Sequence, residues 1–171
     1  MLKRFYPNEY ANSSYIINYE ELYQKGFRGI LFDVDNTLVS HGAKADEKAK
    51  ELITKLKNIG FQVCLISNNK EERVRTFNDE VKVKYIFNAR KPSRKGYQQA
   101  MDTIGTNKDN TIFIGDQIFT DVFGANRAGL KTILVKPIHP KEEIQIVLKR
   151  YLEKIVLYFY MKSTQKSDKK K

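Results

Sequence analysis

The stretch RGILFDVDNTLVS, residues 28–40, decides the fold. An apolar run from Ile30 to Phe32 leads directly into two aspartates, Asp33 and Asp35, which lie one residue apart in sequence. A continuous apolar run of this length is typical of a strand buried on both faces. Carboxylates are rarely buried unless they are paired or bind a metal, so two of them at the end of such a strand indicate a site.

Short β-rich runs alternate with longer amphipathic segments along the rest of the chain. Strands that alternate with helices indicate βαβ units. We therefore predict an α/β fold: a Rossmann-like parallel sheet of about five strands, flanked by helices on both faces. The predicted strands are residues 29–34, 61–67, 84–88, 111–116 and 131–136, and the predicted helices are residues 44–58, 71–80, 93–104 and 120–128.

Polar residues end three of the predicted strands. Parallel sheets bind their ligands beyond the carboxyl ends of the strands, where such residues meet. We therefore expect these side chains to form one site. They are Asp33 and Asp35 after the first strand, Ser67 and Asn68 after the second, and Asp116 after the fourth.

The composition fits a globular protein of one domain. The chain has 171 residues, 41% hydrophobic and 30% charged, and no apolar run approaches the roughly 20 residues that span a bilayer. The N-terminal residues show no signal-peptide pattern, so we expect a cytoplasmic protein. The single cysteine, Cys64, lies among apolar neighbours, which indicates a buried structural thiol.

The net charge of +11 favours an anionic partner. A basic surface attracts phosphorylated small molecules, anionic lipid headgroups and nucleic acid alike. A solvated basic surface that binds nothing explains the charge equally well. The charge alone therefore leaves the class of partner open.

A last helix is predicted to begin near Pro140. Apolar residues recur at helical spacing from Ile144 to Val156, and the stretch IVLYFYMK (155–162) is apolar on nearly every face. Packing on the sheet and peripheral contact with an anionic membrane both explain this stretch. We expect a single domain over residues 1–161 and a basic, disordered tail over residues 162–171.

Four segments, in this order, resemble the motifs of the haloacid dehalogenase (HAD) superfamily of phosphohydrolases. They are DVDNTLV (33–39), LISNN (65–69), ARKPS (89–93) and IGDQIFTD (114–121). Each lies at the end of a predicted strand, and four ordered motifs are far more specific than a lone DxD. The resemblance implies a HAD-like fold. The gaps between the motifs hold no cap domain, so we expect a site that is open to bulky substrates.

Cleavage of a phosphate ester needs a nucleophile, a proton donor and positive charge around the phosphoryl group. At the matched positions, Asp33 is expected to form an aspartyl-phosphate, and Asp35 to protonate the leaving group and then activate water. The expected cofactor is Mg²⁺, bound by Asp33, Asp116 and the backbone carbonyl of Asp35. Thr37 is expected to brace the loop. Asp121 is expected to hold a metal-bound water or to orient the lysine.

Phosphate binding is expected of Ser67 and Asn68, through the serine hydroxyl and the backbone N–H groups that follow. A helix cap is the simpler explanation for the same residue types. Lys91, followed by proline as in the family pattern, is preferred over Lys95 as the lysine that balances the phosphate charge.

Within the superfamily, nearly the whole chain resembles the YqeG-like phosphatases of subfamily IIIA, from the lead-in at residues 5–39 to the closing residues 135–156. That group is similar to mitochondrial phosphatases that act on phosphatidylglycerophosphate. The resemblance implies an Mg²⁺-dependent phosphomonoester hydrolase, with a lipid headgroup phosphate as one candidate substrate. The alternative is a non-catalytic HAD-like module that binds nucleic acid or ribosomes through its basic surface. Intact catalytic motifs argue against that alternative, and the oligomeric state stays open.

Overall fold

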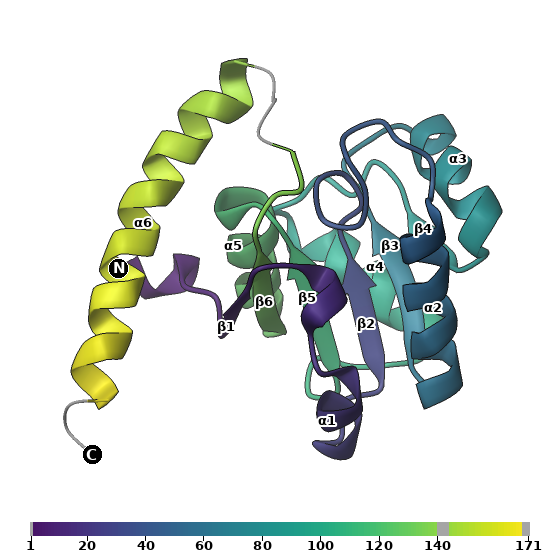
Figure 1. Cartoon of the computed structure of the whole chain (residues 1–171), viewed down its shortest axis with the longest axis horizontal. Helices are drawn as coiled ribbons and strands as arrows, with labels where there is room; N and C mark the ends of the chain where they lie inside the picture. The colour runs from purple at the N-terminus through teal and green to yellow at the C-terminus, as the bar shows by residue number, and fades with distance from the viewer. Residues whose placement is uncertain (1, 140–143, 169–171) are drawn as a thin grey trace.

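Six parallel strands form one sheet in the computed structural model, which describes residues 2–139 and 144–168 (Figure 1). Their order across the sheet is β1-β6-β5-β2-β3-β4, and each neighbouring pair is parallel. The predicted α/β fold with a parallel sheet is confirmed. The strands are β1 (Glu9–Ala11), β2 (Gly29–Phe32), β3 (Gln62–Ile66), β4 (Lys84–Ile86), β5 (Thr111–Gly115) and β6 (Lys131–Val135).

Helices cover both faces of the sheet. Ile30 and Phe32 of β2 share one core with α1, α2 and α3, whereas Leu31 shares the other with α4 and α5. The apolar run of β2 is continuous because alternate side chains of a strand enter opposite cores. The helices are α1 (Tyr19–Gln24), α2 (Glu47–Ile59), α3 (Glu71–Val81), α4 (Arg94–Ile104), α5 (Phe123–Ala128) and α6 (Ile144–Asp168), with short turns η1 (Leu2–Phe5), η2 (Ser14–Ile16) and η3 (Ile118–Val122).

The ends of α2 follow its capping residues. The Asp46 side chain accepts a hydrogen bond from the Ala49 N–H, so the helix begins three residues after the predicted start. Gly60 ends it in the left-handed conformation, with φ of 111°, and a Cβ there would lie 2.7 Å from the Tyr23 hydroxyl. Glycine meets both requirements at this position.

The edge strand β1 is absent from the prediction of about five strands. Its sequence, EYA, carries no apolar run that would indicate a strand. The preceding residue, Asn8, fixes it to β6: its side-chain oxygen accepts from the backbone N–H of Thr132 at 2.8 Å and from the Thr132 hydroxyl at 3.1 Å. The Asn8 N–H also donates to the Thr132 carbonyl. The strand therefore depends on a side-chain clamp rather than on its own composition.

Helix α6 lies beyond the edge of the sheet formed by β6 and β1 (Figure 1). It continues to Asp168, so residues 162–168, for which the sequence predicts a disordered tail, are helical in the structure. The predicted start near Pro140 lies outside the described residues.

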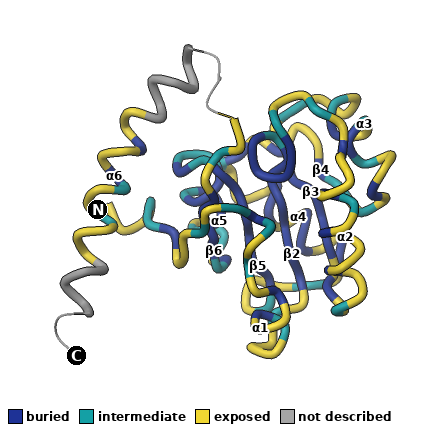
Figure 2. Tube along the Cα trace, viewed as in Figure 1, coloured by how far each residue is buried: buried dark blue, intermediate teal, exposed yellow. Residues whose placement is uncertain are grey.

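Helix α6 contacts the domain along one narrow face. Val156, with the partly buried Leu157, packs on Ile118 of η3 and on Phe5. The buried Glu153 carboxylate accepts a hydrogen bond from the Ile118 N–H at 2.8 Å. Most of the other residues of this helix whose burial is described, within 151–163, are exposed (Figure 2).

Cys64 of β3 is fully buried, as the sequence predicts. Burial raises the pKa of its thiol to about 12, against a smaller lowering by the charge of Lys84. None of the helices that the structure describes, α6 included, is both long and apolar enough to cross a membrane.

Candidate active site

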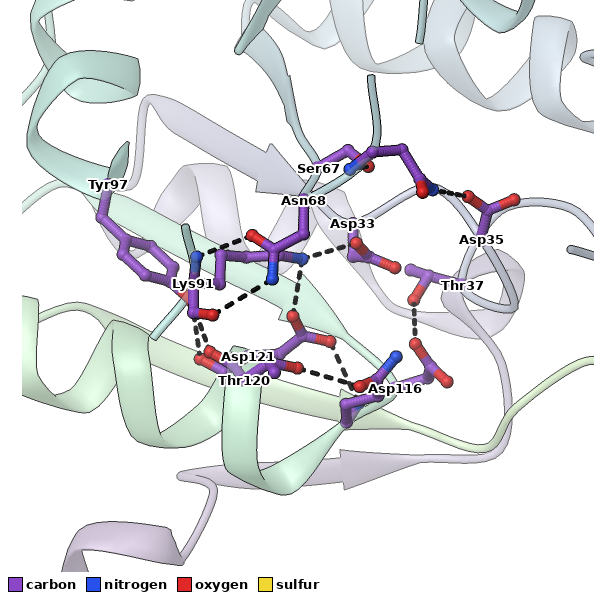
Figure 3. A network of polar contacts seen from close by, with 12 residues as sticks. Asp33, Asp35, Thr37, Ser67, Asn68, Lys91, Tyr97, Asp116, Thr120 and Asp121 are labelled. Carbon is purple, nitrogen blue, oxygen red and sulfur yellow. Dashed lines mark hydrogen bonds and ion pairs between the residues drawn. The ribbon is translucent and has the colours of Figure 1, made fainter. Parts of the chain in front are cut away.

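The polar strand ends converge as the topology requires. β2 lies between β5 and β3, so Asp33, Asp116 and Ser67 emerge side by side at the carboxyl edge of the sheet. The Asp33 N–H donates to the carbonyl of Ile114 on β5 at 2.9 Å. All three of these polar residues are buried. Figure 3 shows this group of side chains from close by.

Lys91 lies at the centre of the group. Its ammonium nitrogen Nζ is 2.5 Å from Oδ1 of Asp33 and 2.7 Å from Oδ1 of Asp121, and its side chain is almost fully buried (Figure 3). Lys95, the other candidate, is exposed in the first turn of α4. The structure therefore brings Lys91, and not Lys95, to the carboxylates.

The Asn68 side chain determines where Lys91 lies. Its amide oxygen accepts from the Lys91 N–H at 2.6 Å, and its amide nitrogen donates to the Lys91 carbonyl at 3.1 Å. This two-way bond ties the loop after β3 to the loop after β4. The Asn68 side chain thus holds the lysine-bearing backbone in place.

The electrostatics of the site are dominated by burial. Burial raises the pKa of Asp33 to about 7, although the Lys91 charge opposes the shift and the Asp121 carboxylate adds to it. For Lys91, burial favours the neutral form, but Asp121 and Asp33 outweigh it and raise its pKa. The lysine is therefore a fixed positive charge, and Asp33 is sensitive to any further cation.

Asp116 and Asp121 complete an acidic cluster around Asp33. One carboxylate oxygen of each of the three lies within 4.8 Å of the others. Thr37 donates its hydroxyl to Asp116 at 3.1 Å, so it braces the carboxylate as well as the loop that follows β2.

The π-helical turn η3 carries Asp121 into the site. The second carboxylate oxygen of Asp121 accepts from the Gln117 N–H at 3.0 Å. A Cβ on Gly115 would lie 2.5 Å from that oxygen, so only glycine leaves room for it. The sequence predicts a regular helix from residue 120, and the wider turn that faces Asp121 inward is not visible from its spacing.

Asp35 lies apart from the cluster (Figure 3). Its carboxylate accepts from the Asn69 amide at 2.7 Å, from the Gly42 N–H at 2.8 Å and from two nitrogens of Arg73 at 2.7 and 3.2 Å. His41 is 3.9 Å from the same carboxylate and largely exposed. These donors orient Asp35 at the rim of the site.

Ser67 is buried at the end of β3. Its hydroxyl accepts from the Asn69 N–H at 3.1 Å, a bond within the turn after β3. The alternative of a helix cap is wrong, because the N-cap of α3 is Lys70, which makes no side-chain capping bond. The Ser67 backbone bonds to both sides, to the carbonyl of Ile86 and to the N–H of Ala89. Ser67 therefore lies at the carboxyl edge of the sheet, where the carboxylates and Lys91 also lie.

Two side chains of the site, those of Arg73 and Asn69, are not part of the sequence-based prediction, which includes Asn69 only through its backbone N–H. Arg73 lies in the first turn of α3, where an arginine in an amphipathic helix is usually solvated. Only its tertiary pairing with Asp35 distinguishes it. The asparagine pair that ends the second motif was a weak signal for Asn69.

The acidic cluster fits a divalent metal ion. Hard oxygen ligands from few carboxylates are the set that Mg²⁺ prefers. Asp33, Asp116 and Asp121 are buried together, with Lys91 as the cation that contacts Asp33 and Asp121. One positive charge leaves three carboxylates incompletely neutralised, which a divalent cation would correct.

Comparison with known proteins agrees with this geometry. Family models described as haloacid dehalogenase-like hydrolase and as HAD-hydrolase-like match residues 30–90 and 88–143. The chain is 35% identical to "Probable phosphatase YqeG" of Bacillus subtilis (strain 168), over 92% of each protein. It is 27% identical to "Phosphatidylglycerophosphate phosphatase 1, chloroplastic/mitochondrial" of Arabidopsis thaliana, over 81% of this chain and 45% of that protein.

Among solved structures, NagD from E. coli K-12 superposes with a TM-score of 0.55 at 12% identity, covering 71% of this chain and 91% of that one. This likeness shows the fold. The comparisons give no support to a non-catalytic module that binds nucleic acid. The four motifs, the parallel sheet and a relative that matches almost end to end agree, and the chain belongs to the YqeG-like phosphatases of the haloacid dehalogenase superfamily.

Proposed function

We propose that the protein is an Mg²⁺-dependent phosphomonoester hydrolase that works through an aspartyl-phosphate on Asp33. The observation that carries the proposal is the position of Asp33: its carboxylate lies at the end of a central strand, bonded to Lys91 and within the cluster of Asp116 and Asp121. A nucleophile held by a cation in a largely buried site is suited to attack a phosphoryl group.

The residues divide the reaction between them. An oxygen of Asp33 attacks phosphorus, the bond to the ester oxygen breaks, and that oxygen takes a proton from Asp35. In the second half, Asp35 removes a proton from water, the water oxygen attacks phosphorus, and the bond to Asp33 breaks to release inorganic phosphate. Ser67, the backbone N–H groups around Asn68, and Lys91 bind the phosphoryl oxygens.

Mg²⁺ would be held by the carboxylates of Asp33 and Asp116 and by the backbone carbonyl of Asp35, with Asp121 close enough to bind directly or through water. When bound, it supplies positive charge that reduces the repulsion between Asp33 and the phosphate. Asp121 holds Lys91, and Lys91 in turn orients Asp33.

A lipid headgroup phosphate, such as that of phosphatidylglycerophosphate, is the candidate substrate that we favour. The relative from Arabidopsis thaliana carries that substrate in its name. No cap is inserted next to the site: the described chain has only a loop and α2 between β2 and β3, and only α3 between β3 and β4. A bulky substrate at a surface can therefore reach Asp33.

Helix α6 favours a peripheral attachment to an anionic membrane, which we include in the proposal together with a cytoplasmic location. Tyr151, Ile155 and Phe159, spaced by four residues, are exposed on one face, with Leu152 and Tyr158 beside them. Lys154 and Lys162 extend along the rings of Tyr151 and Tyr158. Apolar and aromatic side chains bordered by lysines are typical of a helix that lies in a membrane interface.

The test of the function is a phosphatase screen with Mg²⁺ over phosphatidylglycerophosphate, nucleotides and sugar phosphates. We expect hydrolysis that is lost when Mg²⁺ is chelated and in the variants Asp33→Asn and Lys91→Met. Lys95→Met is the matched control and should keep the activity, because Lys95 is exposed outside the cluster. Equal inactivity of the wild type and Asp33→Asn over the whole panel would refute the proposal.

A further inference from the structure

Arg73 is a mostly buried, charged side chain at the rim of the site. It extends from the first turn of α3 to Asp35, where Nη2 and Nε lie 2.7 and 3.2 Å from one carboxylate oxygen. Its side chain is 18% exposed. A guanidinium held so closely beside a catalytic carboxylate either orients that carboxylate or binds something else.

Orientation of Asp35 does not require Arg73. The Asn69 amide and the Gly42 N–H already donate to the two oxygens of the Asp35 carboxylate, at 2.7 and 2.8 Å. With those bonds in place, the carboxylate is fixed by a side chain and a backbone group from two different loops. Arg73 is thus a third donor to a carboxylate that two other groups already hold.

One nitrogen of Arg73 is unsatisfied. Among the described residues, Nη1 of Arg73 is the one buried side-chain nitrogen or oxygen without a hydrogen-bond partner. An unpaired buried donor costs roughly 1–3 kcal/mol, more when it is charged. An anion that entered beside Asp35 would remove this cost, because a guanidinium binds a phosphate or carboxylate through two parallel N–H groups.

The place of Arg73 indicates which part of a substrate it would meet. Asp35 is the proposed proton donor to the leaving group, so its surroundings contact the alcohol part of the ester and not the phosphoryl group. His41, 3.9 Å from the same oxygen of Asp35 and exposed, borders this region from the solvent side. Arg73 and His41 thus flank the path of the leaving alcohol.

We infer that Arg73 determines substrate specificity as a second anion-binding position, one that contacts a phosphate or phosphodiester group in the alcohol part of the ester. This inference rests on the proposed phosphatase function and assigns a residue to the recognition of the leaving alcohol. On binding, the guanidinium turns part of its fork from Asp35 to the substrate anion, while Asn69 and Gly42 continue to hold Asp35.

The experiment compares two kinds of substrate in the full chain with Mg²⁺. The first is glycerol 3-phosphate, whose alcohol part is neutral. The second is the deacylated headgroup of phosphatidylglycerophosphate, whose alcohol part carries a phosphodiester. Values of kcat and KM are measured for wild type, Arg73→Gln, Arg73→Lys and the control Arg75→Gln, which removes an exposed arginine from the same helix.

We expect the wild type to prefer the second substrate, and the ratio of the two kcat/KM values to fall roughly 10- to 100-fold in Arg73→Gln, the size of one lost charge-assisted contact. Arg73→Lys should restore part of the ratio, and Arg75→Gln should leave it unchanged. A comparison of kcat/KM for phosphatidylglycerophosphate in vesicles with that for the free headgroup then shows whether the enzyme prefers the lipid or a soluble metabolite.

An equal loss on both substrates in Arg73→Gln, with an unchanged ratio, would overturn the inference and leave Arg73 as a positioning residue for Asp35. Inactivity of the wild type on every ester is a different result, because it refutes the phosphatase function itself. Thermal melts of the variants, compared with Arg75→Gln, separate a loss of folding from both outcomes.

Discussion

At the scale of single residues, the site buries more negative than positive charge. The carboxylates of Asp33, Asp116 and Asp121 gather around one ammonium group, that of Lys91. Such a cluster opposes folding unless a proton or a cation neutralises it. Burial raises the pKa of Asp33 to about 7, so a proton and a cation compete for this carboxylate near neutral pH.

This pKa predicts how Mg²⁺ binding depends on pH. A metal ion binds the deprotonated carboxylate, so binding releases the proton of Asp33. We expect close to one proton released per ion well below pH 7 and few well above it, with the apparent affinity rising as the pH approaches 7. Calorimetric titrations in buffers of different ionisation enthalpy measure this number. A release that does not change between pH 6 and pH 8 would contradict the prediction.

The metal-free protein supplies the control. The folded-state pKa of Asp33 is above its unfolded value of 3.8, so the folded state binds the proton more tightly. The stability that this group contributes is therefore complete below about pH 4 and is lost as the pH rises towards 7. Asp33→Asn should remove this part of the decline in melting temperature, and Mg²⁺ should offset it in the wild type.

Motif residues and their neighbours differ in how far the sequence predicts them. Asp33, Asp116 and Lys91 were expected at one site from strand ends and motif order, and the structure brings them together. The side chains of Arg73 and Asn69 were not, because an arginine in a helix and an asparagine in a loop have many uses. Their role depends on a contact with Asp35 across more than 30 positions of sequence.

At the scale of elements, loops after neighbouring strands are joined by side chains. The Asn68 amide, which bonds to both the N–H and the carbonyl of Lys91, is the main example. It couples the loop after β3 to the loop that carries the lysine. The position of Lys91 thus depends on both loops and not only on the segment that carries it.

Asn68→Ala is expected to lower activity without removing any group that reacts. The variant leaves the Lys91 backbone without both partners, which costs roughly 1–3 kcal/mol in the free energy of unfolding. We expect a lower kcat, because Nζ of Lys91 loses its fixed position. Denaturant unfolding and steady-state kinetics measure the two effects, with Asn58→Ala, an exposed asparagine of α2, as the control. Wild-type kcat together with reduced stability would show that Lys91 is held by its carboxylates alone.

Elements were predictable where their own composition forms them. The five apolar strands and the four amphipathic helices lie where the sequence places them, within a few residues. The prediction also lacks α1 (Tyr19–Gln24), whereas β1 and η3 were missed for one shared physical reason. The three residues of β1 depend on the Asn8 clamp, and the wide turn of η3 depends on the space left by Gly115 for Asp121. Both are tertiary constraints that local periodicity does not contain.

At the scale of the whole molecule, three features occur together: an active site without a cap, an exposed apolar face on α6, and a net positive charge. The sheet with its five shorter helices forms the domain that carries the catalytic edge, and α6 lies beyond the β1 edge of that sheet (Figure 1). The sequence left two explanations for the apolar stretch of α6, and the structure uses only its inner face for packing. The outer face is available to a surface.

The net charge of +11 decides between a membrane and a second copy as the surface that covers this face. Two copies would bring like charges together, including Lys154 and Lys162 beside the exposed rings. An anionic bilayer accepts the apolar side chains and attracts the lysines at once. We therefore expect flotation with vesicles that contain phosphatidylglycerol, and much less with vesicles of phosphatidylcholine alone.

Two substitutions on the outer face test this expectation. Ile155→Glu and Phe159→Glu place charge in the centre of the exposed stripe, and each should reduce flotation strongly while leaving hydrolysis of a soluble ester unchanged. A third variant, Lys154→Glu, removes a positive charge beside the stripe. Its matched control is Lys48→Glu, which makes the same charge change on the exposed surface of α2. Lys154→Glu should weaken binding more than this control does, and added salt should weaken it further, because the lysine contributes through charge. Full-chain protein that stays with the soluble fraction and sediments as a dimer would assign the same face to a second copy instead.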